Sequence, residues 1–379
     1  MSAGQRYKIA CAYVGTAYRG WQWQPDGVRT VQGALEGAIE AFVGPGNASR
    51  IVTSSRTDAG VHALRNVFHV DMVRRRRQSG DVLPPHEPAT VAKALNAQLR
   101  LRGEHASIVD VAIVDGQDAG WHAAGGQFHA RHSASHREYA YRIAVAPGEG
   151  AAPSVFERER MWWARAELDA GAMAEAARHL VGRHDFSSFR GSGCQATTPW
   201  RTLTDIRVRR VREPLFTVSE PACFSPPAQL LEVRVTARSF LYHMVRNVVG
   251  ALHEVGAGDM APGDMVELLA RRDRSRAPRM APAHGLYLVD VHYPPREGEG
   301  EGEGEGEGEG GDTQRGAQPG AAGEGEGEQR EEEVWRAEAA AARSADRAAA
   351  EGEAAAGAAV GGEPMMANGA APAPPRAAG

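Results

Sequence analysis

The chain has 379 residues and a formal net charge of −5, but the charge is divided unevenly along it. Residues 297–379 contain 19 acidic and 6 basic residues, a net charge of −13, so residues 1–296 carry a net charge of +8. No apolar run approaches the roughly 20 residues that span a bilayer, which excludes an integral membrane protein. The three cysteines form no CxxC pair. A disulfide framework or a cysteine-rich zinc site is therefore not expected, and the pattern is typical of a reducing intracellular compartment.

Neither end of the sequence has the pattern of a folded or targeting segment. Residues 1–5 have no apolar signal core, and a strand-like segment begins by Tyr7. We therefore expect no long transit peptide. Glu-Gly repeats open the segment after Arg296, which continues in Gly, Ala, Glu and Pro. Few apolar groups and many repelling charges predict a disordered acidic tail over residues 296–379.

The first half of the remaining sequence alternates strand-like and helix-like segments. Thr30 is placed to cap a helix with apolar residues on one face. A tight turn at residues 58–60 separates two strand-like segments, and Tyr139 and Tyr141 share one face of a later strand. The predicted strands are residues 7–14, 50–54, 66–71, 107–113 and 137–145. One predicted helix begins after Thr30, and a second spans residues 90–99.

The second half repeats this alternation. Asp169 is placed to cap a helix that Gly182 would end. A long helix over residues 239–255 and a short one after Pro262 follow. The predicted strands are residues 203–212, 230–237 and 286–293.

These elements predict an α+β fold built from two similar mixed α/β subdomains, divided near residues 147–153 and forming a central cleft. The predicted domains are residues 1–150, residues 151–295 and the tail over residues 296–379. Clefts between domains are the usual place for a ligand.

Three features could carry chemistry. Asp58 lies in a sharp turn next to Gly60, where it could be a reactive carboxylate or only bond neighbouring amides. Arg246 lies in an otherwise apolar stretch of helix, and a buried guanidinium needs a carboxylate partner, which could be purely structural. Tyr139 could equally be an ordinary core aromatic residue.

These residues resemble a known family. Residues 56–63 read Arg-Thr-Asp-Ala-Gly-Val-His-Ala, the signature of the tRNA pseudouridine synthase A (TruA) family. Four further segments match in the family's order: residues 13–24, residues 128–131 together with 137–141, residues 240–250 and residues 283–288. The resemblance spans roughly residues 7–293 and implies a pseudouridine synthase fold. The tail has no counterpart in the family pattern.

In the details of these motifs, the sequence is similar to a vertebrate branch of the family called tRNA pseudouridine synthase-like 1. Ser55, Asn66 and the string Ala-Pro-Ala-His-Gly-Leu at residues 281–286 carry this similarity. Bacterial members usually have Gly in place of Ser55 and Gly-Gln in place of Arg65-Asn66. The second difference adds positive charge close to the site, which weakens the case for the bacterial substrate specificity. The branch favours a mitochondrial location, with the cytoplasm as the alternative because no import helix is evident.

The resemblance implies isomerisation of uridine to pseudouridine in tRNA or another structured RNA, with Asp58 as the catalytic carboxylate and Arg246 as the cation that keeps it charged. Asp58 could attack the sugar, attack the base or remove a sugar proton. The uracil must be flipped out of the RNA and stacked. Tyr139 matches the uracil-contacting tyrosine, Leu286 an apolar pocket position, and Arg56 is placed to hold phosphate or replace the flipped base. No metal or cofactor is implied, and His62, His69 and His243 are expected to be structural or to face solvent.

Two arginine clusters suggest how RNA binds. Arg74, Arg75, Arg76 and Arg77 form a run in a predicted loop, either in contact with phosphates or simply solvated, and residues 271–279 contain a second cluster. Two rival functions remain open: an RNA-binding or RNA-folding factor with little isomerase activity, and a nucleoside hydrolase that releases free uracil. The resemblance also makes a homodimer plausible.

Overall fold

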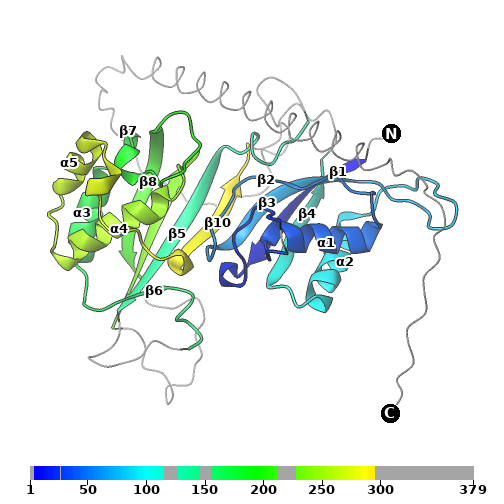
Figure 1. The fold of residues 1–379 in the computed structure, drawn as a ribbon, viewed down its shortest axis with the longest axis horizontal. Helices are drawn as coiled ribbons and strands as arrows, with labels where there is room; N and C mark the ends of the chain where they lie inside the picture. Colours follow the sequence, from blue (N-terminus) through cyan, green and yellow to red (C-terminus); the bar gives the residue numbers. More distant parts are fainter. Residues whose placement is uncertain (1–3, 26, 115–126, 146–154, 212–227, 295–379) are drawn as a thin grey trace, which may run out of the picture. The chain divides into compact units, whose positions relative to one another are not determined.

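The computed structural model describes residues 4–25, 27–114, 127–145, 155–211 and 228–294. Within these residues, ten strands form a single sheet, accompanied by five α-helices (Figure 1). The fold is mixed α/β, as predicted. The predicted boundary at residues 147–153 and the acidic tail lie outside the described residues, and the division into two subdomains stays a prediction.

Strands from both halves of the sequence share this sheet. Its order is β4-β1-β3-β10-β5-β9-β8-β7, with β2 paired to β3 and β6 paired to β5. The pairs are antiparallel except for β10 with β3 and β5 with β6. The strands are β1 Gln5–Tyr13, β2 Val52–Thr53, β3 His62–Met72, β4 Ala106–Ile113, β5 His136–Val145, β6 Trp162–Ala164, β7 Gly182–Asp185, β8 Trp200–Arg210, β9 Gln229–Ala237 and β10 Leu286–His292.

Strand β10 joins the two halves. It follows every other strand in the described sequence, yet it lies between β3 and β5 (Figure 1). Tyr287 and Leu288 pair with His62 and Ala63 on one side, and β10 pairs with β5 from Leu286 to His292 on the other. Residues at the start of β10 therefore lie close to the start of β3, next to the turn that carries Asp58.

The helices pack on the two ends of the sheet. Helices α1 (Val31–Val43) and α2 (Pro88–Leu101) contact each other, and α2 packs on β4. Helix α3 (Ala170–Arg178) packs on β8 and contacts α4 (Met244–Ala257), while α5 (Asp264–Arg271) lies beside β7. None of these helices, in the part of the chain that the structure describes, has the length and apolar character needed to cross a membrane.

Both predicted helix caps are present. The Thr30 side chain accepts a hydrogen bond from the Gly33 amide at 3.2 Å. Asp169 Oδ1 accepts from the amides of Gly171 and Ala172 at 2.8 and 3.0 Å. Each cap satisfies backbone donors that have no partner inside the helix, which contributes about 1 kcal/mol to stability.

Two predicted helix boundaries are wrong. Helix α3 ends at Arg178 rather than at Gly182, which begins β7 with a φ of 99°. Helix α4 begins at Met244 rather than at Ser239, because His243 takes a left-handed conformation with φ of 62°. The helical periodicity of residues 239–243 was therefore misleading, and the short strands β6 and β7 gave no recognisable pattern.

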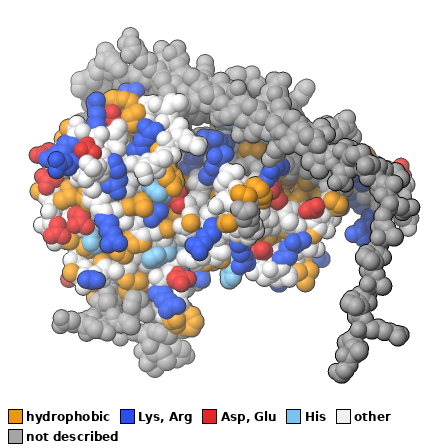
Figure 2. Space-filling model, viewed as in Figure 1, with side chains coloured by type: hydrophobic (Ala, Val, Ile, Leu, Met, Phe, Trp, Pro, Cys, Tyr) orange, Lys and Arg blue, Asp and Glu red, His pale blue; other side chains and the backbone are white. Residues whose placement is uncertain are grey.

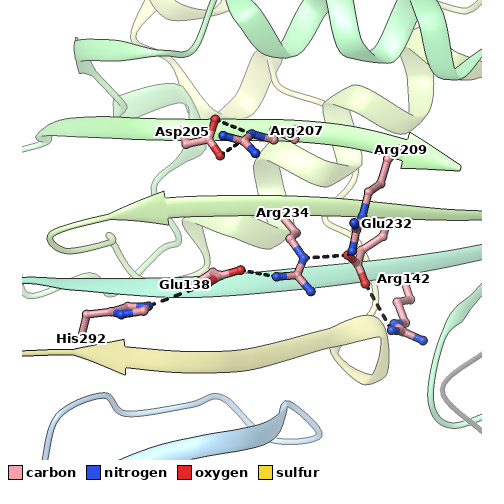
Figure 3. Close-up of polar contacts among 8 residues, drawn as sticks. All are labelled: Glu138, Arg142, Asp205, Arg207, Arg209, Glu232, Arg234 and His292. Carbon is pink, nitrogen blue, oxygen red and sulfur yellow. Dashed lines mark hydrogen bonds and ion pairs between the residues drawn. The ribbon is translucent and has the colours of Figure 1, made fainter. Parts of the chain in front are cut away.

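Strand β5 has two chemically different faces, as its alternation predicted. Tyr139, Tyr141 and Ile143 are buried in the main core. Glu138 and Arg142 point the other way and join ion pairs with residues of β9 and β10 (Figure 3). We call the set centred on Glu232 the Glu232 network; its members are Glu138, Arg142, Arg209, Glu232 and Arg234.

Candidate active site

Asp58 lies in a tight turn between β2 and β3. The Val61 amide donates to the Asp58 carbonyl oxygen at 3.1 Å and closes the turn. Gly60 has a φ of 83°, a left-handed conformation that favours glycine, and a Cβ there would lie 3.2 Å from that of Ala283. A tight turn of this kind leaves the Asp58 side chain at the surface of the core with 19% of its area exposed.

The N-terminal segment fixes the turn from one side. The hydroxyls of Tyr13 and Thr57 lie 2.8 Å apart, and the Trp21 amide donates to the Thr57 carbonyl at 3.0 Å. Gly15 packs so closely on the turn that a Cβ at this position would lie 1.9 Å from the Val61 carbonyl oxygen. The sequence motif near Tyr13 therefore acts structurally, by holding the backbone on both sides of Asp58.

Arg246 reaches Asp58 from the other half of the sequence. Arg246 Nη1 donates to Asp58 Oδ2 at 3.4 Å, and Nε donates to the Ala281 carbonyl at 2.9 Å. The Arg246 side chain is 11% exposed. The carbonyl bond fixes the guanidinium where its positive charge stabilises the carboxylate, and part of the Asp58 side chain stays exposed.

The segment before β10 contacts both Arg246 and His62. The Ala281 amide donates to the Arg246 carbonyl at 3.1 Å. His62 Nδ1 accepts from the Gly15 amide at 3.1 Å, so its Nε2 carries the proton and faces the carbonyls of Glu159 and His284, each at 3.1 Å. Burial, opposed by these carbonyl bonds, lowers the pKa of His62 to about 4. His62 is thus a neutral structural residue, as expected from the sequence.

His243 is the residue near Asp58 whose proximity the sequence did not reveal. Its Nε2 lies 3.4 Å from Asp58 Oδ2. Burial lowers its pKa, the positive charges of Arg246 and Arg274 lower it further, and the Asp58 charge opposes them. The expectation that His243 is structural or faces solvent missed this contact. The spacing of three residues before Arg246 was the available signal, but the assumed helix gave His243 the wrong backbone conformation.

Tyr139 lies beside the same site. Its hydroxyl is 2.7 Å from that of Ser55, and its ring packs edge-on against Phe240 at 5.1 Å between centroids. Burial raises the pKa of Tyr139, and the nearby charge of Asp58 adds to that rise, while Ser55 and Arg137 oppose it. The phenol is therefore protonated at neutral pH and can donate a hydrogen bond.

The remaining predicted site residues have different environments. Leu286 is buried at the start of β10, opposite Tyr141 of β5. Arg56 is exposed two residues before Asp58. The structure brings together Asp58, Arg246 and Tyr139. It supplies no contact that tests the roles predicted for Leu286 and Arg56.

The arginine run lies in an exposed loop after β3, as predicted. Within this loop Arg75 Nη1 donates to the Gly80 carbonyl at 3.1 Å. All four members of the run are exposed: Arg74, Arg75, Arg76 and Arg77. In the second cluster, Arg274 is tied to the Asn247 side chain at 2.9 Å and Arg271 to Glu267, while Arg276 and Arg279 are exposed. The exposed arginines remain candidates for contact with phosphate.

Arg65 does not add free positive charge to the site. Its guanidinium lies 3.1 Å from Asp110 and 3.3 Å from Asp290, so two carboxylates neutralise it. Its neighbour Asn66 is fully buried and donates to the Ser55 carbonyl at 3.0 Å and to the Tyr13 hydroxyl at 3.1 Å. Asn66 therefore supports the backbone of the turn.

The described residues contain no group of three or more His, Cys, Asp or Glu side chains arranged to hold a metal ion. Two surface hollows of about 360 and 380 Å³ lie beside Arg6 and beside Tyr18. Neither is lined by Asp58, Tyr139 or Arg246. The predicted cleft between the two halves stays a prediction.

A partly exposed aspartate held by an arginine, next to a buried protonated tyrosine, defines a site for carboxylate chemistry on a polar substrate. Comparison with known proteins identifies that class as RNA-modifying isomerases. Residues 176–294 match the family model described as tRNA pseudouridine synthase. The chain is 39% identical to a tRNA pseudouridine synthase A of Mesorhizobium japonicum over 289 residues, which are 76% of this chain and 99% of the relative.

Two further relatives agree. Proteins of the same name from Paramagnetospirillum magneticum and Rhodospirillum rubrum are 41% and 40% identical, and the match covers 76% of this chain and 95% and 88% of the relatives. The chain belongs to the TruA-type tRNA pseudouridine synthase family. These relatives are bacterial.

Proposed function

We propose that this protein isomerises specific uridines to pseudouridine in tRNA, with Asp58 as the catalytic carboxylate. The observation that carries the proposal is the half-open ion pair: Arg246 Nη1 binds Asp58 Oδ2, while the side chain keeps 19% of its area exposed. One oxygen of Asp58 is held here, and the other is left to meet a substrate.

The surrounding groups suit a reaction on a flipped base. Tyr139 offers an aromatic ring on which a uracil can stack and a phenol that keeps its proton, since burial raises its pKa. Arg246 stabilises the charge of Asp58 without taking part in proton transfer. Among the described residues, the charged or titratable groups in contact with Asp58 are Arg246 and His243, and neither is a second carboxylate. Glycoside hydrolysis commonly uses two carboxylates, so this arrangement favours isomerisation over release of free uracil.

RNA binding would use the basic surface. Lys and Arg side chains are spread over the face seen in Figure 2. Arg56 is exposed beside Asp58, and the run from Arg74 to Arg77 is exposed in the loop after β3. Side chains of this kind neutralise phosphates and release counterions, so the affinity for RNA should fall steeply as salt is raised.

Asp58→Asn is the experiment that tests the function. The purified variant should lose at least about 10³-fold in the rate of pseudouridine formation on tRNA, because an amide cannot act as a nucleophile or a base. Its melting temperature and RNA affinity should stay close to those of the wild type. Asp205→Asn is the matched control, because it makes the same chemical change in a different ion pair, that of Asp205 with Arg207 on β8. Nucleoside mass spectrometry of the digested RNA measures the product.

Three outcomes would overturn the proposal. Pseudouridine formation by Asp58→Asn at the wild-type rate would remove Asp58 from catalysis. Free uracil released from the RNA would indicate a hydrolase. RNA binding or refolding without any pseudouridine would indicate an RNA-folding factor on the same scaffold.

We also propose that the chain belongs to the vertebrate tRNA pseudouridine synthase-like 1 branch and acts in mitochondria. The sequence of residues 54–66 and 281–286 supports the assignment to this branch. The cytoplasm is the alternative location. A phylogenetic tree of the family that placed the chain among bacterial members would contradict its assignment to the vertebrate branch. Pseudouridine mapping with and without the protein would identify the RNA, and loss of the mark from a cytoplasmic RNA alone would contradict the location.

Family resemblance further supports a homodimer, with RNA reaching across both subunits. Sedimentation velocity of the purified protein should give twice the mass of one chain, 40.4 kDa. A single species at the mass of the monomer, with full activity, would exclude a required dimer.

A further inference from the structure

Ser55 connects the catalytic turn to Tyr139. The two hydroxyl oxygens lie 2.7 Å apart, although 84 residues separate Ser55 and Tyr139 in the sequence. Ser55 stands three residues before Asp58. The same short segment therefore carries the carboxylate and a hydroxyl that contacts the phenol of the site.

The backbone of Ser55 is held by hydrogen bonds on both sides. The Ser55 carbonyl accepts from Asn66 Nδ2 at 3.0 Å and from the Thr53 hydroxyl at 3.1 Å, and its amide donates to Thr53 Oγ1 at 3.3 Å. Asn66 is itself fully buried, and its Oδ1 accepts from the Ser54 hydroxyl at 2.9 Å. This network immobilises the backbone on both sides of Ser55 and so fixes the Cβ that carries the hydroxyl. The contact with Tyr139 then sets the direction of the hydroxyl.

Tyr139 needs such a contact. The Tyr139 ring packs edge-on against Phe240, and the residue is only 8% exposed. A buried phenol without a hydrogen bond is costly. A serine hydroxyl has one donor and two acceptor sites, so it can donate to the phenolic oxygen and leave the phenolic proton for a second acceptor.

We propose that Ser55 is a positioning residue that holds the phenolic oxygen of Tyr139 toward the flipped uracil, so that the phenolic proton is available to the substrate. The proposal rests on the function proposed above. Ser55 touches neither substrate nor Asp58 in this role and acts through Tyr139 alone. Its removal should therefore matter only as long as Tyr139 has a hydroxyl.

A double-mutant cycle tests this dependence. Ser55→Ala should lower kcat about 5- to 10-fold, as expected for loss of one hydrogen bond, with KM changed less than about twofold. Tyr139→Phe should lower kcat by at least as much. Ser55→Ala added to Tyr139→Phe should cause no further loss beyond about twofold. Ser55→Thr, which keeps the hydroxyl, should restore most of the activity. Ser135→Ala is the matched control, because Ser135 bonds the His292 carbonyl at 3.1 Å at the start of the same strand region.

A second measurement does not depend on activity. Tyrosine labelled with ¹³C at Cζ gives one NMR resonance per tyrosine, and the resonance that disappears in Tyr139→Phe is that of Tyr139. This resonance should shift in Ser55→Ala and keep its position in Ser135→Ala. Wild-type kcat in Ser55→Ala, or losses that multiply in the double variant, would overturn the proposal, as would an unshifted resonance. A wild-type protein that makes no pseudouridine but shows the shift would refute the proposed function and leave the Ser55–Tyr139 contact established.

Discussion

Two clusters of charged side chains differ in how completely they enclose a carboxylate. Glu232 is 1% exposed and receives three guanidinium groups, from Arg209 at 2.6 Å, Arg234 at 2.7 Å and Arg142 at 3.2 Å (Figure 3). Asp58 is 19% exposed and has one guanidinium at 3.4 Å and one imidazole at 3.4 Å. Burial alone would raise the pKa of Glu232, but the hydrogen bonds from Arg234 and Arg209 outweigh it and lower the pKa.

The difference separates a closed cluster from a partly open one. Both oxygens of Glu232 are bound by guanidinium groups and the side chain is almost fully buried, and the Glu232 network ties β5, β8 and β9 together. Asp58 has fewer and longer contacts, which stabilise its charge and keep it reachable. The closed, buried arrangement of Glu232 suits a structural role, and the looser, half-open pair of Asp58 suits the catalytic role proposed above.

The largest effect should come from breaking the Asp58 pair. Arg246→Met keeps the length of the side chain but removes its charge, so the turnover of saturating RNA should fall about 10²- to 10³-fold. Arg274→Met is the control, because Arg274 is half-buried but contacts carbonyls and the Asn247 amide. Its melting temperature should fall while its turnover stays near that of the wild type. Equal turnover losses in the two variants would mean that Arg246 has only a structural role.

Breaking the Glu232 network should have the opposite signature. Glu232→Gln leaves three guanidinium groups without their shared anion, so the free energy of unfolding should fall by about 2–3 kcal/mol. Turnover by the folded fraction should be unchanged. Asp205→Asn, which breaks an exposed pair, should cost less than about 1 kcal/mol. Chemical denaturation and single-turnover assays measure both, and a turnover loss in Glu232→Gln at full folding would contradict the comparison.

Acid should destabilise the two buried histidines of β3 before it affects the Glu232 network. The pKa values of His62 and His69 are lowered to about 4, mainly by burial. The unfolded chain then binds more protons than the folded one between pH 6.5 and 4, so stability is complete above pH 6.5 and falls as the pH drops through this window. Each histidine should cost about 2 kcal/mol at pH 5. His69→Gln should reduce the pH dependence of unfolding, whereas the exposed His105→Gln should leave it unchanged.

The smallest effect is expected at His243. Its pKa is lowered by burial and by neighbouring arginines, so it is neutral at pH 7 and contributes no ion pair to Asp58 there. His243→Gln should lower turnover only about 3- to 10-fold, because it loses one polar neighbour of the carboxylate. A loss as large as that of Arg246→Met would make the imidazole an essential partner of Asp58.

The sequence predicted the features that depend on local pattern. The alternation of residues 137–145 gave β5 and its two faces, Thr30 and Asp169 gave two caps, and the turn at Asp58 was placed correctly. It could not predict contacts between distant residues, such as Ser55 with Tyr139 or His243 with Asp58. The pairing of Arg65 with Asp110 and Asp290 was invisible for the same reason. The resemblance to a family, rather than any pattern, suggested Arg246 as the partner of Asp58.

The position of β10 has a consequence for the order of folding during synthesis. The turn with Asp58 and the strand with Tyr139 are translated early, but the strand that lies between β3 and β5 and the Ala281 carbonyl that holds Arg246 are among the last described residues. A nascent chain lacking residues 281–292 has two incomplete sheet edges and no assembled site. The enzyme therefore cannot become active before β10 has emerged from the ribosome. Premature termination upstream of Ala281 should yield an aggregation-prone fragment rather than a partly active one.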